Sequence, residues 1–284
     1  MANLQDIRHR ISSVNSTKQI TSAMNMVATS RLRRAKGAAV ANRPYAEKVM
    51  QVVKQVAANA GSDFMDPLLE THETGKKLIF VITADKGLAG AYTSNACKKA
   101  TSLVEDKANT QLVVVGRKGI AHFRSRQYDI VDSYVGISDR ATFEDARKIA
   151  QNLMNRFRSG EIREVVMVYT KFISAISCEP QSVELLPFKQ ETGAAEGIHD
   201  EYIFEPDAAT VLGYLLPQYL YTTIYAALLQ SAASELSSRM NAMSNATDNA
   251  DEMVRKLNIH YNKVRQAGIT TELTEIVSGA TALE

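Results

Sequence analysis

The two ends of the chain repeat their apolar residues every three or four positions, a spacing typical of long amphipathic helices. At the start, the repeat consists of Leu4, Ile7, Ile11 and Val14. The same spacing continues to Ala35 through more polar residues. A second, offset stripe consists of Ile20, Met24 and Val27. Because only Gly37 and Pro44 interrupt residues 3–58, the pattern predicts one helix of up to about 80 Å.

The other end of the chain carries the more regular repeat. Its stripe residues step four and three positions at a time from Leu236 to Gly268, the pattern of a left-handed coiled coil. The stripe restarts at Ile269 in a shifted register. The spacing predicts a helix over residues 208–281, about 110 Å long. Since a helix of that length cannot be buried in a globule of 284 residues, we expect the two chain ends to pair as an antiparallel coiled coil.

The middle of the chain has a different texture. Short runs rich in β-branched residues predict strands at residues 78–83, 111–116, 129–135 and 164–170. Helical stretches separate these runs near residues 92–107, 117–125 and 142–158. Such alternation indicates an α/β domain with a largely parallel sheet. The polar segment 188–201 predicts a loop or linker.

Composition narrows the class of protein. With 45% hydrophobic and 23% charged residues, the chain has the composition of a soluble, folded protein. Cys97 and Cys178 form no CxxC pair, which favours free thiols in a reducing compartment. Residues 208–234 contain no charged side chain, but Pro217 and Gln218 lie within them and polar groups are costly inside a bilayer. A helix buried against protein is therefore the better interpretation of this segment.

Positive charge is concentrated near the start of a chain that is almost neutral overall. Between Asp6 and Glu47 there is no other carboxylate, whereas the whole chain has 33 basic and 31 acidic residues. The basic residues of this stretch are Arg8, Arg10, Lys18, Arg31, Arg33, Arg34, Lys36 and Arg43. They could bind nucleic acid phosphates, contact an acidic protein partner or form a solvated helix face, and composition leaves these three alternatives open. Binding of single-stranded nucleic acid would favour aromatic residues among the basic ones, and the cluster at residues 31–36 contains none.

One glycine-rich segment is a candidate for ligand binding. Residues 83–95, TADKGLAGAYTSN, follow a predicted strand and precede a predicted helix, so Gly87 and Gly90 could let backbone amides approach a phosphate. A nucleotide-using α/β enzyme is therefore one hypothesis. The segment lacks the GK[ST] of a P-loop and the third glycine of a dinucleotide fingerprint, so a structural turn is the alternative, with Asp85 and Lys86 as surface or partner contacts. Since the histidines show no metal-ligand spacing and no nucleophile motif occurs, nothing in the sequence by itself indicates catalysis, a metal or a cofactor.

The segment QAGITTELTEIVSGA, residues 266–280, resembles the C-terminal signature of the gamma subunit family of F-type ATP synthases, I-T-x-E-L-x-E-I-x-x-G-A. Further segments that resemble the family are residues 7–35, RPYAE at 43–47, the glycine-rich segment at 83–95, YIFEPD at 202–207 and YNKVRQA at 261–267. The resemblance thus covers essentially the whole chain.

The resemblance implies a fold in which the terminal helices wind as an antiparallel coiled coil, with a Rossmann-like α/β domain at the foot. The corresponding segments are residues 1–58, 76–190 and 208–284. It also implies a central rotor stalk without a catalytic site or cofactor of its own, which couples proton- or sodium-driven rotation of the membrane c-ring to the catalytic beta subunits. The implied partners are three alpha and three beta subunits, the epsilon subunit and the c-ring, with no nucleic acid and no transmembrane segment.

The resemblance also implies roles for individual residues. Contacts with the beta subunit are implied for Arg265, Gln266, Met24, Arg239, Arg33, Arg34 and Lys36. Contacts with the c-ring and the epsilon subunit are implied for Tyr202 and Glu205.

The chain departs from the family's pattern at a few positions. Gly268 stands where relatives often have Ala or Ser, and Ala89 stands where a Cys is frequent. The chloroplast regulatory insertion with its cysteine pair is absent, so thiol switching is not expected. The helical repeat within the first residues argues against a transit peptide. The resemblance then implies a bacterial complex, in which this chain is a peripheral component on the cytoplasmic face of the inner membrane.

Overall fold

The computed structural model describes residues 4–59, 66–188, 205 and 207–281. Its residues form two compact units, one from Met1–Ala28 with Met240–Glu284 and the other from Thr29–Arg239. We call them the coiled-coil unit and the α/β unit. Helix α1 (Leu4–Asn59) and helix α5 (Ala208–Thr281) each contribute a segment to both units. The two long terminal helices that the sequence predicts are confirmed, and both continue through the prolines inside them, Pro44 and Pro217.

In the coiled-coil unit, α1 and α5 run antiparallel. Lys18 pairs with Asp251, and Arg8 donates to the hydroxyl of Tyr261, so the partner number on α5 rises as the number on α1 falls. Every position of the predicted repeat from Met243 to Gly268 is buried or half-buried. The antiparallel pairing predicted from the two repeats is therefore confirmed within this unit.

Polar residues take part in this seam where the apolar repeat of α1 thins. Thr21 is buried at a stripe position, and the hydroxyl of Thr247 lies 2.8 Å from the hydroxyl of Thr21. The offset stripe does not enter the seam, since the exposed fractions of Ile20, Met24 and Val27 are 56%, 42% and 52%. The residues of α1 that face α5 thus follow the three-four spacing that begins at Leu4. Polar residues such as Thr21 take the place of apolar ones where the repeat thins.

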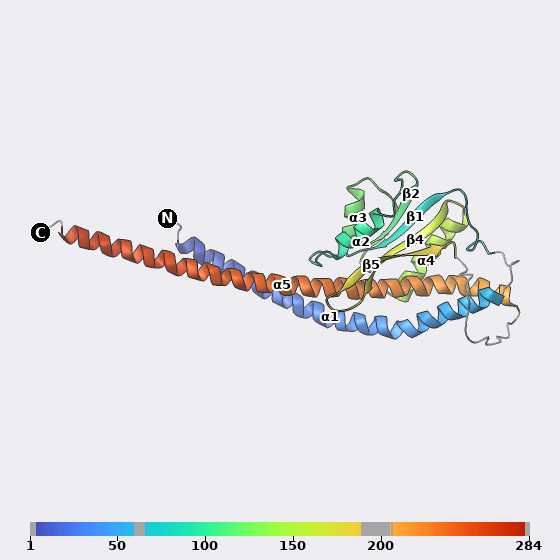
Figure 1. Ribbon diagram of the computed structural model, residues 1–284, viewed down its shortest axis with the longest axis horizontal. Coiled ribbons are helices and arrows are strands. Elements are labelled where there is room, and N and C mark those ends of the chain that lie inside the picture. The colour runs from blue at the N-terminus through green and yellow to red at the C-terminus, as the bar shows by residue number, and fades with distance from the viewer. Residues whose placement is uncertain (1–3, 60–65, 189–204, 206, 282–284) are drawn as a thin grey trace. The chain divides into compact units, whose positions relative to one another are not determined.

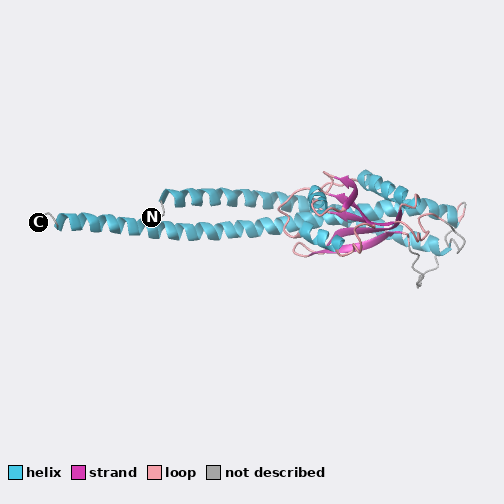
Figure 2. Ribbon diagram, turned by 90° about the horizontal axis from the view of Figure 1, so that it is seen from above, coloured by secondary structure: helices cyan, strands magenta, loops and turns pink. Residues whose placement is uncertain are grey.

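The coiled-coil unit ends with α5 alone. Figure 2 shows α5 continuing beyond the first turn of α1. After Gly268 the restarted stripe lies exposed, with Ile269, Leu273 and Ile276 at 49%, 57% and 68% exposure. This segment presents apolar side chains that no residue of the coiled-coil unit covers among those described.

The α/β unit contains a five-stranded sheet in the order β3-β2-β1-β4-β5. Its strands are β1 (Lys76–Ile82), β2 (Thr110–Val115), β3 (Asp129–Tyr134), β4 (Ile162–Phe172) and β5 (Cys178–Leu186). The pairs β1–β2, β1–β4 and β2–β3 are parallel, and β4–β5 is antiparallel. The largely parallel sheet is confirmed. The sequence pattern does not predict β5, because Pro180 and a mixed polar run obscure its alternation, and an edge strand tolerates such a proline.

Three short helices connect the parallel strands: α2 (Tyr92–Thr101), α3 (Arg117–Arg124) and α4 (Phe143–Arg158). The predicted extension of the first helix to residue 107 is wrong. The helix ends at Thr101, and the chain then turns at Asp106, whose carboxylate accepts hydrogen bonds from the backbone of Ala108 and the side chain of Asn109. At the start of α4, the side chain of Thr142 and that of Asp145 form a capping box, which fixes the beginning of this helix.

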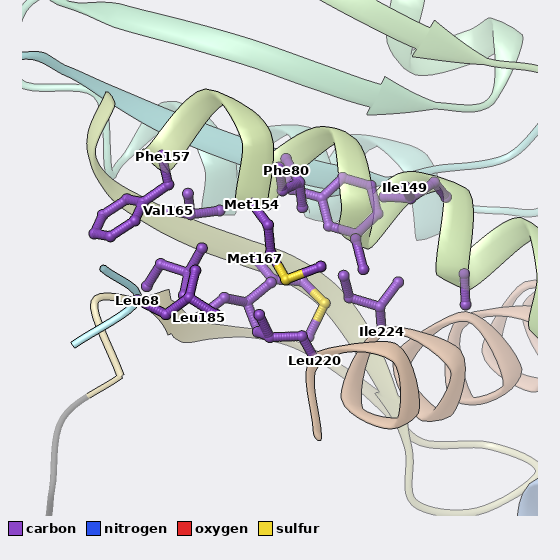
Figure 3. Packing of buried hydrophobic residues seen from close by; sticks show 14 of the residues in the cluster. Leu68, Phe80, Ile149, Met154, Phe157, Val165, Met167, Leu185, Leu220 and Ile224 are labelled. Carbon is purple, nitrogen blue, oxygen red and sulfur yellow. The ribbon is translucent and has the colours of Figure 1, made fainter. Parts of the chain in front are cut away.

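Apolar side chains cover both faces of the sheet, and Figure 1 shows the strands with α2, α3 and α4 beside them. One face carries α4 and the first part of α5, and Figure 3 shows Phe80, Met167 and Leu220 packed together with Ile149 and Ile224. The other face carries α2 and α3, with Cys97 and Phe123 among its buried residues. Each such side chain contributes roughly 1.5–3 kcal/mol when it is removed from water.

The charge-free segment of residues 208–234 belongs to this core. Leu212, Leu216, Leu220 and Ile224 are all buried in the α/β unit. The interpretation of this segment as a helix buried against protein is confirmed. In the parts of the chain that the structure describes, no helix is long and apolar enough to cross a membrane.

Candidate functional site

The glycine-rich loop (residues 83–91) lies where open α/β sheets usually bind ligands. The chain moves from β1 outward to β2 and β3 and then returns to β4 on the other side of β1. Ligands of doubly wound folds bind in the crevice at the carboxyl ends of the strands where the order reverses. In this sheet that place is between β1 and β4, and the glycine-rich loop leaves β1 beside it.

Asp85 organises this loop from inside. Its carboxylate accepts hydrogen bonds from the backbone N–H of Gly136 at 2.8 Å and from those of Ser138 and Arg117 at 3.2 Å. Burial opposes ionisation of Asp85, but these hydrogen bonds outweigh it and hold the pKa of the carboxyl below its ordinary value. Asp85, expected from the sequence to be a surface or partner contact, is half-buried and ties the loops after β1, β2 and β3 together.

The tip of the glycine-rich loop is strained and exposed. Leu88 has a φ of 62°, in the left-handed region that residues with a Cβ rarely adopt. Its side chain is 61% exposed, so core packing does not account for this conformation. Such backbone outliers persist only where the surroundings hold them, and they gather at functional sites.

Helix α5 fills the crevice that a ligand would use. The hydroxyl of Ser231 accepts from the N–H of Thr170 at 3.2 Å, and the hydroxyl of Ser234 donates to the carbonyl of Thr170 at 3.0 Å, near the carboxyl end of β4. The Arg239 guanidinium donates to the carbonyl oxygens of Lys86 and Gly87, at 3.4 and 3.3 Å. These contacts argue against the hypothesis of a nucleotide site at Gly87 and Gly90, because this chain's own helix lies across the place.

A buried acid accompanies Arg239. Glu235 is 1% exposed, and its Oε1 lies 2.7 Å from the Nη2 of Arg239. Burial raises the pKa of Glu235 above its ordinary value, while the adjacent Arg239 acts in the opposite direction. Sequence reasoning missed Glu235. The available signal was its place as the first charge after the charge-free segment, four residues before Arg239.

The basic cluster at residues 31–36 of α1 divides into two groups. Arg31 forms an ion pair of 2.9 Å with Asp139, a carboxylate whose side chain is 14% exposed and which also pairs with Lys86 at 3.4 Å. The exposed group consists of Arg33, Arg34 and Lys36. Arg31 therefore makes a contact within the α/β unit, whereas the three predicted contact residues beside it have exposed side chains.

The remaining predicted site residues lie in separate parts of the chain, and one of them lies outside the described residues. Arg265 and Gln266 are exposed on α5 beside the seam residue Val264. Met24 lies in the coiled-coil unit and Arg239 in the α/β unit. Glu205 is exposed, and Tyr202 lies outside the described residues. In the described part of the chain, His, Cys, Asp and Glu side chains form no group of three or more that could hold a metal ion.

Fold and site together define a class of protein: a coiled-coil protein with an α/β domain in which the chain's own helix α5 lies across the usual ligand crevice. Residues 3–283 match the family model described as ATP synthase. The chain is 44% identical to the ATP synthase gamma chain of Desulforamulus reducens over the full length of both. It is 40% identical to the sodium ion specific gamma chain of Acetobacterium woodii, over 99% of each. The chain belongs to the ATP synthase gamma chain family.

Solved structures agree with this assignment. The central stalk and c-ring structure of the Tetrahymena thermophila mitochondrial ATP synthase contains a chain that is 28% identical, with a TM-score of 0.62 over 80% of this chain and 99% of that one. A rotor chain of the Euglena gracilis mitochondrial ATP synthase, 16% identical, matches with a TM-score of 0.67 over 94% of this chain and 98% of that one, which shows a shared fold.

Proposed function

We propose that this chain is the central-stalk rotor subunit of a bacterial F-type ATP synthase. It couples proton- or sodium-driven rotation of the membrane c-ring to conformational change at the catalytic beta subunits. The observation that carries the proposal is the end of α5, where exposed apolar side chains follow Gly268 on a helix segment without Lys or Arg. A helix end with exposed apolar side chains and no basic residue suits a bearing that turns inside a ring of partner subunits.

The physical basis of coupling is the asymmetry of one shaft among three equivalent partners. A single α1–α5 pair cannot make the same contacts with three alpha–beta pairs at once, so each angle favours a different set of open and closed catalytic sites. Since coupling free energies are reciprocal, nucleotide binding biases the shaft angle as much as the shaft angle biases nucleotide affinity.

We further propose where the partners are contacted. Arg265 and Gln266, exposed beside the seam, contact beta through charge-assisted hydrogen bonds, and Met24 and Arg239 belong to the coupling region. The exposed group Arg33, Arg34 and Lys36 faces acidic loops of beta, which favours approach through long-range attraction. Tyr202 and Glu205 contact the c-ring and the epsilon subunit. Segments 1–58 and 208–284 act as the shaft, and segment 76–190 acts as the foot.

In this proposal the subunit has no catalytic site or cofactor of its own, and nucleotides bind to the alpha and beta subunits. Two observations support it: α5 lies across the crevice of the α/β unit, and Asp85 binds backbone amides there. The chain is held at the cytoplasmic face of the bacterial inner membrane through its complex, as a peripheral component.

Co-purification tests the proposed function. Expressed with the alpha and beta subunits of the same organism, the chain should be recovered with both in one complex that hydrolyses ATP. Recovery of the chain alone would reject the proposal. The competing hypothesis, a basic coiled-coil nucleic acid binder, requires tight DNA or RNA binding by the full chain with a steep loss of affinity as salt increases.

A further inference from the structure

The glycine-rich loop is held from two sides by side chains of the long helices. From α5, Arg239 donates to the carbonyl oxygens of Lys86 and Gly87. From α1, Arg31 binds Asp139, whose carboxylate also binds the ammonium of Lys86. All of these residues belong to the α/β unit. The strained tip of the loop at Leu88 therefore follows directly after two residues whose backbone is tied to α5.

Arg239 depends on Glu235 for its orientation. Its bonds to the two carbonyl oxygens, at 3.4 and 3.3 Å, are longer than usual for N–H donors, whereas its bond to Glu235 is 2.7 Å. The short bond involves two charges, and charge-assisted hydrogen bonds are the stronger kind. Because Glu235 is almost fully buried and lies one helical turn before Arg239, it can fix the guanidinium in one direction.

Other acid–base pairs on α5 have the same spacing without this burial. Glu252 pairs with Lys256 at 2.7 Å, but the two side chains are 62% and 73% exposed. Exposed ion pairs of this kind contribute little to stability and do not hold their side chains in one orientation. The difference between Glu235 and Glu252 is thus the environment of the carboxylate, which makes Glu252 a matched control.

We propose that Glu235 is a positioning residue of the rotor. It holds Arg239 against the carbonyl oxygens of Lys86 and Gly87, and through them keeps Leu88 in its left-handed conformation as a rigid, exposed contact element. The loop then moves with α5 as one body, so that a force on the loop is passed to the helix. The coupling consequence rests on the proposed rotor function, whereas the positioning of Arg239 does not.

Hydrogen exchange of the full chain tests the positioning. In Glu235→Gln, whose side chain keeps the shape of the acid, the amides of residues 84–92 should exchange about tenfold faster than in the wild type, because a charge-assisted bond is lost. Glu252→Gln should leave these amides unchanged. Equal exchange of the loop in both variants would overturn the proposal.

A second variant guards against failure of the first to fold. Arg239→Lys keeps the charge but replaces the rigid guanidinium, whose Nη2 contacts the carboxylate and both carbonyl oxygens, with a compact ammonium on a flexible stem. It should loosen the same amides, and the double variant with Glu235→Gln should loosen them no further than Arg239→Lys does. Additive loosening would show that the two residues act separately, which contradicts positioning.

The coupling consequence is measured in the assembled complex in membrane vesicles. Glu235→Gln should retain ATP hydrolysis and lose ion pumping per ATP hydrolysed, while Glu252→Gln keeps both. A looser loop with unchanged pumping would overturn the role as a contact element. If the wild-type chain itself does not assemble, the rotor function fails, and the exchange experiment still decides whether Glu235 positions Arg239.

Discussion

Gly119 is required by the close approach of α3 to β1. A Cβ at this position would lie 2.4 Å from the hydroxyl oxygen and 2.8 Å from the methyl carbon of Thr83, whose side chain is fully buried. The same Thr83 hydroxyl accepts a hydrogen bond from the N–H of Gly119 at 3.1 Å. We expect Gly119→Ala to lower the free energy of unfolding by about 1–3 kcal/mol through overpacking, measured by urea denaturation of the full chain.

Gly37 is the control for that substitution. A Cβ there would have no described heavy atom within 4 Å, and the position is inside α1. Gly37→Ala should therefore stabilise the chain by about 0.5–1 kcal/mol through helix propensity. If both variants shift the urea midpoint in the same direction, the packing argument for Gly119 is wrong.

Asp85 makes the stability of the α/β unit depend on pH. Its pKa is held below the ordinary value by hydrogen bonds from the backbone, against the opposing effect of burial. A depressed folded-state pKa stabilises the fold at pH values above the ordinary carboxyl pKa, and this contribution is lost as the pH falls through the folded pKa. Asp85→Asn should therefore destabilise the chain at pH 7, and the difference from the wild type should shrink below about pH 4.

Denaturation of both proteins at pH 7 and at acidic pH measures this dependence. Asp106→Asn is a suitable control, because Asp106 also accepts a backbone hydrogen bond, from Ala108, but in an exposed turn. If Asp85→Asn destabilises the chain equally at all pH values, the loss of stability does not come from the charge of the Asp85 carboxylate, and the prediction is wrong.

At the scale of single residues, the sequence identifies chemistry but not environment. Arg31 and Arg239 stand out in the sequence as charged helix residues, yet their partners Asp139 and Glu235 matter because they are buried. Burial of a carboxylate depends on elements that are far apart in the chain, such as the loop after β3. Local periodicity carries no information about such contacts.

At the scale of elements, a helix or strand can be predicted when its sequence pattern depends only on residues near one another in the chain. The repeat from Leu236 to Gly268 predicts α5 well because every turn of the helix repeats the same spacing. Strands β1, β2 and β4 follow from their β-branched runs, since a strand covered on both faces is largely apolar. The edge strand β3 is only half-buried, and a shorter β-branched run predicts it. The edge strand β5 escapes prediction because only its pairing with β4 makes its mixed sequence extended.

The polar pair in the coiled-coil seam gives an element-scale prediction. Thr21 and Thr247 meet at 2.8 Å between hydroxyl oxygens, at positions where apolar residues would pack better. Polar seam residues fix register at a cost in stability. Thr21→Val together with Thr247→Val should raise the thermal midpoint of the full chain, followed by helical circular dichroism, by a few degrees, corresponding to about 1 kcal/mol.

Two exposed threonines provide the control. Thr17 and Thr271 each donate to the carbonyl four residues earlier, as Thr247 does, but both lie outside the seam. The corresponding pair of valine substitutions should leave the midpoint nearly unchanged. An equal rise of the thermal midpoint in both double variants would show that valine stabilises any position of these helices. It would contradict the argument that the polar pair in the seam lowers stability.

At the scale of the whole molecule, charge is distributed by segment. The chain carries 33 basic and 31 acidic residues, but residues 266–284 contain no Lys or Arg, and α1 keeps an exposed basic group at Arg33, Arg34 and Lys36. Net charge therefore says little about this protein, whereas the positions of the charges correspond to the separate partner contacts proposed above. The sequence alone suffices for this distribution, because it depends on order along the chain.

The last prediction concerns transmission from the shaft to the catalytic ring. Arg265 and Gln266 are exposed on α5, just before the seam ends at Gly268. If they contact beta as proposed, Arg265→Ala with Gln266→Ala should leave assembly intact and lower ATP hydrolysis and synthesis by the complex about tenfold, since one charge-assisted hydrogen bond can supply that factor. Asn262→Ala with Lys263→Ala removes a similar amide and cation from exposed neighbouring positions and should leave the rates unchanged. Wild-type rates in both double variants would reject the contact at Arg265 and Gln266, and equal losses in both would indicate a general weakening of α5.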